Sequence, residues 1–230
     1  MALSGRYDDH DQMTPNVSQR IDWQALIESQ PALARIPDGL RAIADRLQFR
    51  AGETLFRTGN RLKGVFCVIA GEVRLIRHAR NGAEIVLQRA RGGFFAEASI
   101  GTGTYHCDAV AAQPGALLRF PAQAFRAALA NDEMFRDAWI AHLARELLRS
   151  RAQAERLGLK SATQRIVHYI ESEGAAGTLA LTDSRKAWAA ELGLTHEALY
   201  RALRRMQANG TLDMDGKRMS LRRGGSAVRR

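Results

Sequence analysis

Cysteines are scarce in this 230-residue sequence, and no long hydrophobic run interrupts it. Its two cysteines, Cys67 and Cys107, are too few for a disulfide framework and form no Cys-x-x-Cys pair. The most apolar run, residues 65–70, has the length of a strand, so we expect neither a membrane span nor a signal peptide. These absences favour a cytoplasmic protein that does not depend on disulfides.

The sequence also lacks the residue patterns of common active sites. It contains no nucleophile paired with a base, no glycine-rich phosphate loop and no metal-ligand pair at a diagnostic spacing. The cluster Asp8-Asp9-His10-Asp11 has metal-binding residue types, but residues 1–20 around it are polar and show no apolar period. We therefore predict a flexible arm over residues 1–20, no metal site, and a protein that is not an enzyme.

Positive charge is what the sequence has in excess. The formal net charge is +10, while 46% hydrophobic and 25% charged residues are typical of a soluble globular protein of one or two domains. From Ser184 onward, eleven basic residues stand against four acidic ones, so this segment carries +7 of the charge. The segment favours a nucleic-acid partner over a membrane surface, because each phosphate contact releases counterions.

Residues 184–221 show the pattern of a winged helix-turn-helix. Two short helical patterns flank residues 192–195, where Gly193 permits a sharp turn and Thr195 can cap the second helix. After residues 209–210, two short strands joined by an Asp215-Gly216 turn form the wing. On the second helix the apolar face holds Leu199, Ala202, Leu203 and Met206, and the opposite face holds Glu197, Tyr200, Arg201, Arg204 and Arg205. The alternatives are an ordinary amphipathic helix with a solvated face and a winged helix used for protein contacts.

The preceding part of the chain changes its period twice. Residues 21–47, ending with Leu47, favour short helices broken at Pro31 and Pro37. Residues 49–121 hold short apolar runs between glycines, which predicts a β sandwich or barrel with separate strands on either side of Gly71 and a hairpin turn at Asn81-Gly82. Residues 122–130 then predict a short helix, and residues 132–157 a long one.

The long helix has a stripe of apolar and small residues at alternating steps of three and four. This coiled-coil spacing predicts a partner helix, most simply the same helix of a second subunit, and a helix packed on its own β domain is the alternative. A hinge is expected at residues 158–160, followed by another helix over residues 161–172. The predicted dimer interface consists of Ile140, Leu143, Leu147, Ser150, Ala154 and Leu157.

This order of elements resembles the Crp/Fnr family of bacterial transcription regulators over residues 23–221. The resemblance implies an α+β protein with an N-terminal double-stranded β-helix (β-roll), a long dimerisation helix and a C-terminal winged helix-turn-helix. The corresponding boundaries are a cyclic-nucleotide-binding-like domain at 21–130, the dimerisation helix and hinge at 131–158, and a DNA-binding domain at 159–230. The resemblance to this family rests on five motifs. They are Phe49-x-x-Gly52-x-x-Leu55-Phe56-x-x-Gly59, Gly71-Glu72-Val73 within residues 65–75, Gly93-Phe94-Phe95-Ala96-Glu97, residues 189–201 with Glu197 and Arg201, and Asn209-Gly210-Thr211-Leu212.

In regulators of this kind, the glutamate that matches Glu97 contacts the ribose of a cyclic nucleotide, and an arginine some ten residues later holds the phosphate. This sequence has Cys107-Asp108 in one register and Tyr105-His106 in the other, so neither supplies the arginine. Ala96 also replaces a glycine before the glutamate, which adds a side chain near the ligand. Because a buried phosphate without a cation is costly, we predict that cyclic AMP is not the effector.

Other effectors stay open. Two cysteines cannot hold an iron-sulfur cluster from one chain, whereas residues 95–98 and 159–163 resemble the nitric-oxide-responsive, haem-associated regulators of the family. Haem with His106, Cys107 or His142 as axial ligand, a redox thiol at Cys107, an unidentified small metabolite and no effector at all are the alternatives; no cofactor is firmly predicted. The predicted effector pocket consists of Phe95, Glu97, Tyr105, His106, Cys107 and His142.

The resemblance also implies how double-stranded DNA is bound. His196, Glu197, Tyr200 and Arg201 match the positions that face base edges, where Arg201 can pair with guanine and Glu197 can accept from cytosine. His196 stands where one branch of the family has arginine, and Tyr200 stands where the other branch has serine, so the half-site cannot be copied from either. A homodimer implies a pseudo-palindromic site, and the family implies contact with RNA polymerase. Further contacts to DNA, mostly to phosphates, are expected from Thr182, Ser184, Arg185, Lys186, Arg204 and Lys217.

Overall fold

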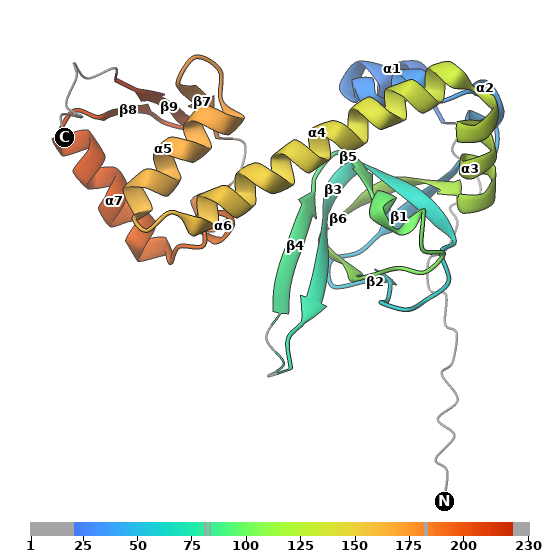
Figure 1. Ribbon diagram of the computed structural model, residues 1–230, viewed down its shortest axis with the longest axis horizontal. Helices are drawn as coiled ribbons and strands as arrows, with labels where there is room; N and C mark the ends of the chain where they lie inside the picture. Colours follow the sequence, from blue (N-terminus) through green and yellow to red (C-terminus); the bar gives the residue numbers. More distant parts are fainter. Residues whose placement is uncertain (1–20, 81, 83, 182–183, 223–230) are drawn as a thin grey trace, which may run out of the picture. The chain divides into compact units, whose positions relative to one another are not determined.

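The computed structural model describes residues 21–80, 82, 84–181 and 184–222. The predicted arm over residues 1–20, Asn81 of the predicted hairpin turn and Thr182 therefore lie outside the described residues. The chain divides into two compact units between His142 and Leu143, inside helix α4 (Glu133–Gly158). We call them the β-roll unit and the winged-helix unit, and Figure 1 shows the elements of each.

The β-roll unit begins with short helices. They are α1 (Trp23–Ser29), the 3₁₀ helix η1 (Pro31–Arg35) and α2 (Asp38–Arg41). Both prolines separate helices as predicted, because Pro31 is the first residue of η1 and Pro37 directly precedes α2. Leu47, expected at the end of these helices, lies instead in strand β1 (Asp45–Phe49). The alternation of buried Leu47, exposed Gln48 and buried Phe49 has the period of a strand, and strand pairing with β6 decides the conformation.

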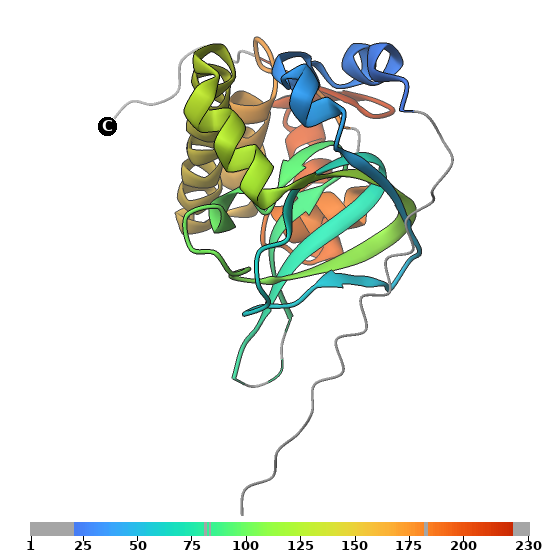
Figure 2. The same cartoon turned by 90° about the vertical axis from the view of Figure 1, so that its right-hand side faces the viewer.

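Antiparallel strands curl around one interior in this unit (Figure 2). After β1 come β2 (Thr54–Phe56), β3 (Gly64–His78), β4 (Glu84–Ala90), β5 (Gly93–Phe95) and β6 (Asp108–Pro121). The sheet has the order β1-β6-β3-β4, while β2 pairs with β6 and β5 with β3. The register of β3 and β4, which brings His78 opposite Glu84, confirms the predicted hairpin around Gly82.

Strand β3 corrects the prediction of two strands separated by Gly71. It is continuous over fifteen residues, and shifts of register against β6 on both sides of Gly71 bend it without ending it. Gly71 has φ +82°, and a Cβ atom there would lie 2.5 Å from the carbonyl oxygen of Pro114. Glycine is therefore required at this position because the backbone at Pro114 approaches it closely. In the sequence alone, a glycine at such a close approach looks the same as a glycine that ends a strand.

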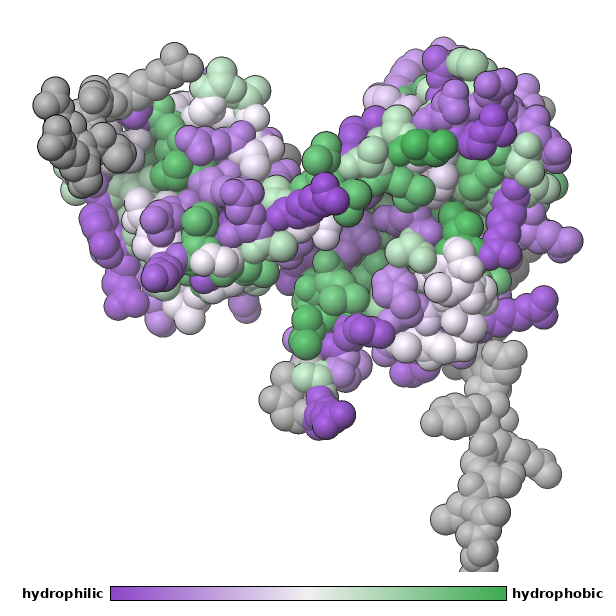
Figure 3. All heavy atoms as spheres, in the orientation of Figure 1, coloured by the Kyte–Doolittle hydropathy of each residue, from purple (hydrophilic) through white to green (hydrophobic). Residues whose placement is uncertain are grey.

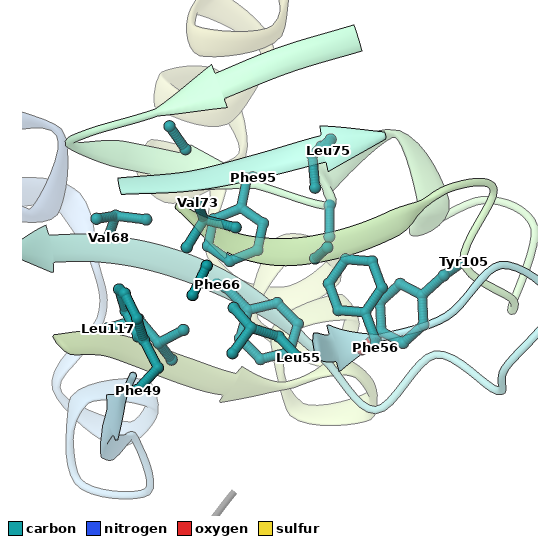
Figure 4. Packing of buried hydrophobic residues seen from close by; sticks show 14 of the residues in the cluster. Phe49, Leu55, Phe56, Phe66, Val68, Val73, Leu75, Phe95, Tyr105 and Leu117 are labelled. Carbon is teal, nitrogen blue, oxygen red and sulfur yellow. The ribbon is translucent and has the colours of Figure 1, made fainter. Parts of the chain in front are cut away.

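Two hydrophobic clusters hold the β-roll unit together. One fills the interior of the roll and includes the rings of Phe56, Phe66, Phe95 and Tyr105 (Figure 4). The other packs the roll against α3 (Ala122–Asn131) and the first half of α4, with Phe125, Phe135 and Trp139 at its centre. Both helices were predicted, and the Asp132 side chain caps α4 by accepting a hydrogen bond from the Phe135 amide at 2.9 Å.

The winged-helix unit follows the predicted order with two differences. Its elements are the end of α4, α5 (Ala162–Glu173), β7 (Thr178–Ala180), α6 (Arg185–Glu191), α7 (His196–Ala208), β8 (Leu212–Asp215) and β9 (Arg218–Leu221). Strand β7 was not predicted, and it joins the wing in the order β7-β9-β8. Because Asp215 pairs with Arg218, the two-residue turn is Gly216-Lys217, one residue later than predicted. The α+β fold class is confirmed.

Two arginines attach the end of α4 to the winged-helix unit. Arg156 is 1% exposed, donates to Ser172 Oγ and Glu173 Oε1 at 3.0 Å each, and lies 4.4 Å from the centre of the Tyr169 ring. Arg165 donates to the carbonyl oxygens of Leu157 and Leu159 at 3.1 and 2.9 Å. These bonds give residues around the predicted hinge at 158–160 fixed partners on α5, so the second half of α4 belongs to this compact unit.

Candidate nucleic-acid interface and effector pocket

Helix α7 has one buried face and one exposed face. Thr195 caps it as predicted, since its hydroxyl accepts a hydrogen bond from the Ala198 amide at 3.1 Å. The buried face consists of Leu199, Ala202, Leu203 and Met206, as predicted. His196, Glu197, Arg201, Arg204 and Arg205 are exposed, and Tyr200 is half-buried.

The turn before α7 is held from outside the helix-turn-helix. Gly193 has φ +62°, and a Cβ atom there would lie 2.8 Å from Leu157 Cδ2 and 3.0 Å from Arg165 Nη1. Arg165 donates to the carbonyl oxygens of Leu192 and Gly193 at 3.1 Å each, in addition to those at the end of α4. One guanidinium group therefore joins the end of α4 to the turn that sets the position of α7. Sequence reasoning missed Arg165, because its partners are backbone atoms that leave no side-chain pattern.

Residues from α6 and α7 flank Tyr200. The guanidinium carbon of Arg185 lies 5.2 Å from the centre of the Tyr200 ring, and the His196 ring centre lies 4.5 Å from it. Arg185 is the first residue of α6, which Ser184 caps by accepting from the Ala187 amide at 3.2 Å. The structure thus brings together a residue predicted to contact phosphate and two residues predicted to face bases.

The start of α6 also meets the wing around a cavity of about 180 Å³. Ser184, Arg185 and Lys217 line it together with apolar side chains. These three residues were predicted as phosphate contacts from separate parts of the sequence, and the pairing of β8 with β9 brings Lys217 to the other two. Lys186 is exposed on the same helix. The arrangement concentrates positive charge beside α7, which suits a polyanion.

The predicted seam on α4 is exposed over most of its length. Ile140 is 57% exposed and Leu147 51%, and the other seam residues, Leu143, Ser150, Ala154 and Leu157, are exposed as well. The helix packs on its own β domain with a different pair, Phe135 and Trp139, so that contact leaves the seam available. Figure 3 shows further apolar surface over strand β4, and two apolar residues of this strand, Ile85 and Leu87, are exposed. Exposed apolar stripes of this kind mark protein contact surfaces.

The predicted effector pocket is divided between different environments. Phe95, Tyr105 and Cys107 belong to the core inside the roll, where the Tyr105 and Phe56 rings stack with their centres 3.7 Å apart (Figure 4). The Tyr105 hydroxyl accepts hydrogen bonds from the amides of Lys63 and Gly64 at 3.1 and 3.2 Å. Burial raises the pKa of the Tyr105 hydroxyl and raises the pKa of the Cys107 thiol to about 11. Cys107 is therefore a protonated core thiol at neutral pH.

Glu97 and His106 lie at the edge of this core. Ala96 has φ +65°, a conformation that favours glycine, and Glu97 opens the 3₁₀ helix η2 (Glu97–Ser99) directly after it. His106 Nδ1 lies 3.0 Å from Ser99 Oγ, and Arg77 donates to the His106 carbonyl oxygen at 3.0 Å. Burial and the charge of Arg77 lower the pKa of His106, so the ring is neutral at pH 7.

His142 comes from an α-helix, whereas the other predicted pocket residues come from strand β5, the 3₁₀ helix η2 and the loop before β6. It lies on α4 in ring contact with Phe94 and Trp139, at centre distances of 5.5 and 4.9 Å. His106 and Cys107 lie on the loop that leads into β6, and Cys107 belongs to the core inside the roll. Within the described residues, no group of three or more histidine, cysteine or acidic side chains has the geometry to hold a metal ion.

Asp108 and Arg77 are residues of this region whose roles sequence reasoning missed. The Asp108 carboxylate accepts hydrogen bonds from the Thr58 amide and hydroxyl at 2.7 and 2.8 Å. Arg77 comes to the loop from β3, some thirty residues earlier in the chain, which no local motif reveals. A fixed carboxylate thus stands beside Cys107, where the family resemblance implies a phosphate-binding pair.

These features define a class of protein: a β-roll with a filled interior, joined by one long helix to a basic winged helix-turn-helix. No helix among the described residues is long and apolar enough to cross a membrane.

Comparisons with known proteins agree with this class. Residues 46–132 match the family model of the cyclic nucleotide-binding domain. FixK2 from Bradyrhizobium japonicum has a similar structure, with 25% sequence identity, a TM-score of 0.59, and coverage of 78% of this chain and 93% of that chain. Curated proteins give no significant sequence match.

Two further structures share the fold. CLP from Xanthomonas campestris, described as a c-di-GMP-responsive global regulator, is 22% identical with a TM-score of 0.55, covering 83% of this chain and 98% of that chain. CprK in complex with OCPA is 18% identical with a TM-score of 0.61, covering 81% and 90%. The predicted resemblance to the Crp/Fnr family is confirmed: residues 46–132 match the cyclic nucleotide-binding domain, and the structural neighbours are Crp/Fnr regulators.

Proposed function

We propose that this protein is a homodimeric, sequence-specific DNA-binding transcription regulator whose effector is not cyclic AMP. The observation that carries the proposal is the exposed polar face of the capped helix α7, which lies beside the cations Arg185 and Lys217 of α6 and the wing. The exposed seam on α4 supports a dimer, and a two-fold dimer suits a pseudo-palindromic site.

The interior of the roll supports the proposal about the effector. Stacked aromatic rings occupy it, and the positions implied for phosphate binding hold the buried Cys107 and the carboxylate of Asp108. Phosphate placed there would lose its hydration beside a fixed negative charge, which is unfavourable. Nearby cations on β3 and β4 already have partners, since Arg77 bonds the His106 carbonyl and Arg89 bonds Glu72 at 2.8 Å. Two proteins of similar fold support this proposal, since CLP is described as c-di-GMP-responsive and CprK was solved in complex with OCPA.

Fluorescence anisotropy tests both parts of the proposal. The ligand-free protein is titrated into pseudo-palindromic and scrambled duplexes at fixed salt, and the titration is repeated with cyclic AMP. We expect a preference for some palindromes that cyclic AMP does not change. Binding that appears only with cyclic AMP would refute the proposed effector, and equal binding to every duplex would refute sequence-specific recognition.

The variant Arg201→Ala tests whether helix α7 carries the preference for particular DNA sequences. A bidentate contact from arginine to guanine contributes about 1–3 kcal/mol of discrimination, so the variant should lose about 5- to 150-fold in preference for the cognate site. Arg50→Ala is the matched control, because it removes the same charge from an exposed residue of the β-roll unit. Equal effects of the two substitutions would assign Arg201 a general electrostatic role only.

A further inference from the structure

Arg185 has a position that a simple phosphate contact does not require. Its guanidinium carbon lies 5.2 Å from the centre of the Tyr200 ring, within the range of a cation–π interaction. His196 approaches the same ring to 4.5 Å between ring centres, with the two planes at 58°. Tyr200 is therefore flanked by one residue from α6 and one from its own helix.

Helix caps and the core determine where these three side chains start. Ser184 caps α6 directly before Arg185, and Thr195 caps α7 directly before His196. The α6 residue Trp188 is buried in the same cluster as Leu199 of α7, so the two helices are packed against each other. The contact between Arg185 and Tyr200 thus joins two helices whose relative position is fixed by the core.

We infer that Arg185 is a positioning residue that holds the Tyr200 ring for base recognition and so contributes to DNA sequence preference. This inference rests on the proposed function. A half-buried tyrosine can adopt more than one rotamer, and each flanking contact reduces that freedom before DNA binds. Arg185 also lines the cavity beside Lys217, so the same guanidinium group connects the base-reading helix to the basic surface.

The two roles of a basic residue give different results in a binding assay. A phosphate contact strengthens binding to every sequence and increases the dependence on salt, whereas a base-positioning contact changes the relative affinity for different bases. Lys186 is the matched control, because it is the next residue on α6, carries the same charge and is exposed.

The test begins with selection of preferred duplexes from a randomised pseudo-palindromic pool by the full-length protein. Affinities of wild type, Arg185→Ala, Lys186→Ala, Tyr200→Ala and the double variant Arg185→Ala/Tyr200→Ala are then measured on the selected site and on its single-base variants. Tyr200→Ala identifies the base pair that Tyr200 reads. Thermal denaturation of each variant confirms that the winged-helix unit stays folded.

We expect Arg185→Ala to reduce discrimination about 3- to 10-fold at the base pair read by Tyr200, and Lys186→Ala to weaken binding equally at all positions. In the Tyr200→Ala background, Arg185→Ala should no longer change discrimination at that base pair. A uniform loss with Arg185→Ala, or additive effects in the double variant, would overturn the inference while the proposed function stands. A wild-type protein that selects no sequence would overturn both.

Discussion

Arg165→Ala tests whether the turn of the helix-turn-helix is held by the end of α4. The guanidinium group makes four hydrogen bonds to backbone carbonyls, of which those to Leu159 and Leu192 are partly buried and those to Leu157 and Gly193 are exposed. Water can replace the two exposed hydrogen bonds in the variant, so the stability lost comes mainly from the two partly buried ones. At about 1–1.5 kcal/mol each, their loss should lower the free energy of opening of this region by about 2–3 kcal/mol.

Hydrogen exchange followed by mass spectrometry locates the effect. A loss of 2–3 kcal/mol corresponds to exchange about 30- to 150-fold faster in peptides that cover residues 157–160 and 192–199. Peptides from strand β3 serve as an internal control, because they belong to the other compact unit and should not change. Arg165→Lys keeps the charge but offers a single ammonium group, so it should recover only part of the protection.

Two results would contradict this reasoning. Exchange unchanged at residues 192–199 would mean that the α6–α7 turn is stable without Arg165 and that its four bonds contribute little. Full recovery by Arg165→Lys would mean that charge near the end of α4, and not the forked geometry of the guanidinium group, stabilises the region.

Three further predictions concern the rest of the chain. Leu147→Glu on the exposed seam should weaken self-association more than 100-fold, since a buried leucine contributes about 1.5–3 kcal/mol in each subunit; analytical ultracentrifugation measures this, and Ala141→Glu outside the seam should leave the mass unchanged. Ala176 is exposed and has φ +51°, so Ala176→Gly should stabilise the protein by about 0.5–1 kcal/mol, whereas the control Ala175→Gly should destabilise it. Urea denaturation measures both variants, and equal stabilities would refute backbone strain at Ala176. Burial lowers the pKa of His106 in the folded protein, so below the ordinary histidine pKa of about 6.5 the unfolded state binds more protons, and stability should fall as the pH drops through that range. His106→Gln should therefore reduce the slope of stability against pH. An identical slope in the variant would contradict the lowered pKa.

Much of the fold could be predicted because its signals are local. Prolines at 31 and 37, the cap at Thr195 and the apolar periods of α4 and α7 act within one or two helical turns, and the structure confirms them. The errors occurred where distant strands decide. Leu47 joins β1 because β6 pairs with it, and Gly71 bends β3 because Pro114 passes close by. Those partners lie more than forty residues away, beyond the reach of any pattern in the sequence.

The amino-acid sequence by itself determined which face of α7 is polar, where the positive charge gathers and which residue types stand where a phosphate-binding arginine is expected, because these depend only on the order of side chains. Tertiary structure alone decided their surroundings. It put Arg77 beside His106, Arg165 between α4 and the Gly193 turn, and Arg185 over the ring of Tyr200. The physical reason is that chain folding brings together groups from separate elements, and the strength of a charge or hydrogen bond depends on the distance and burial that result.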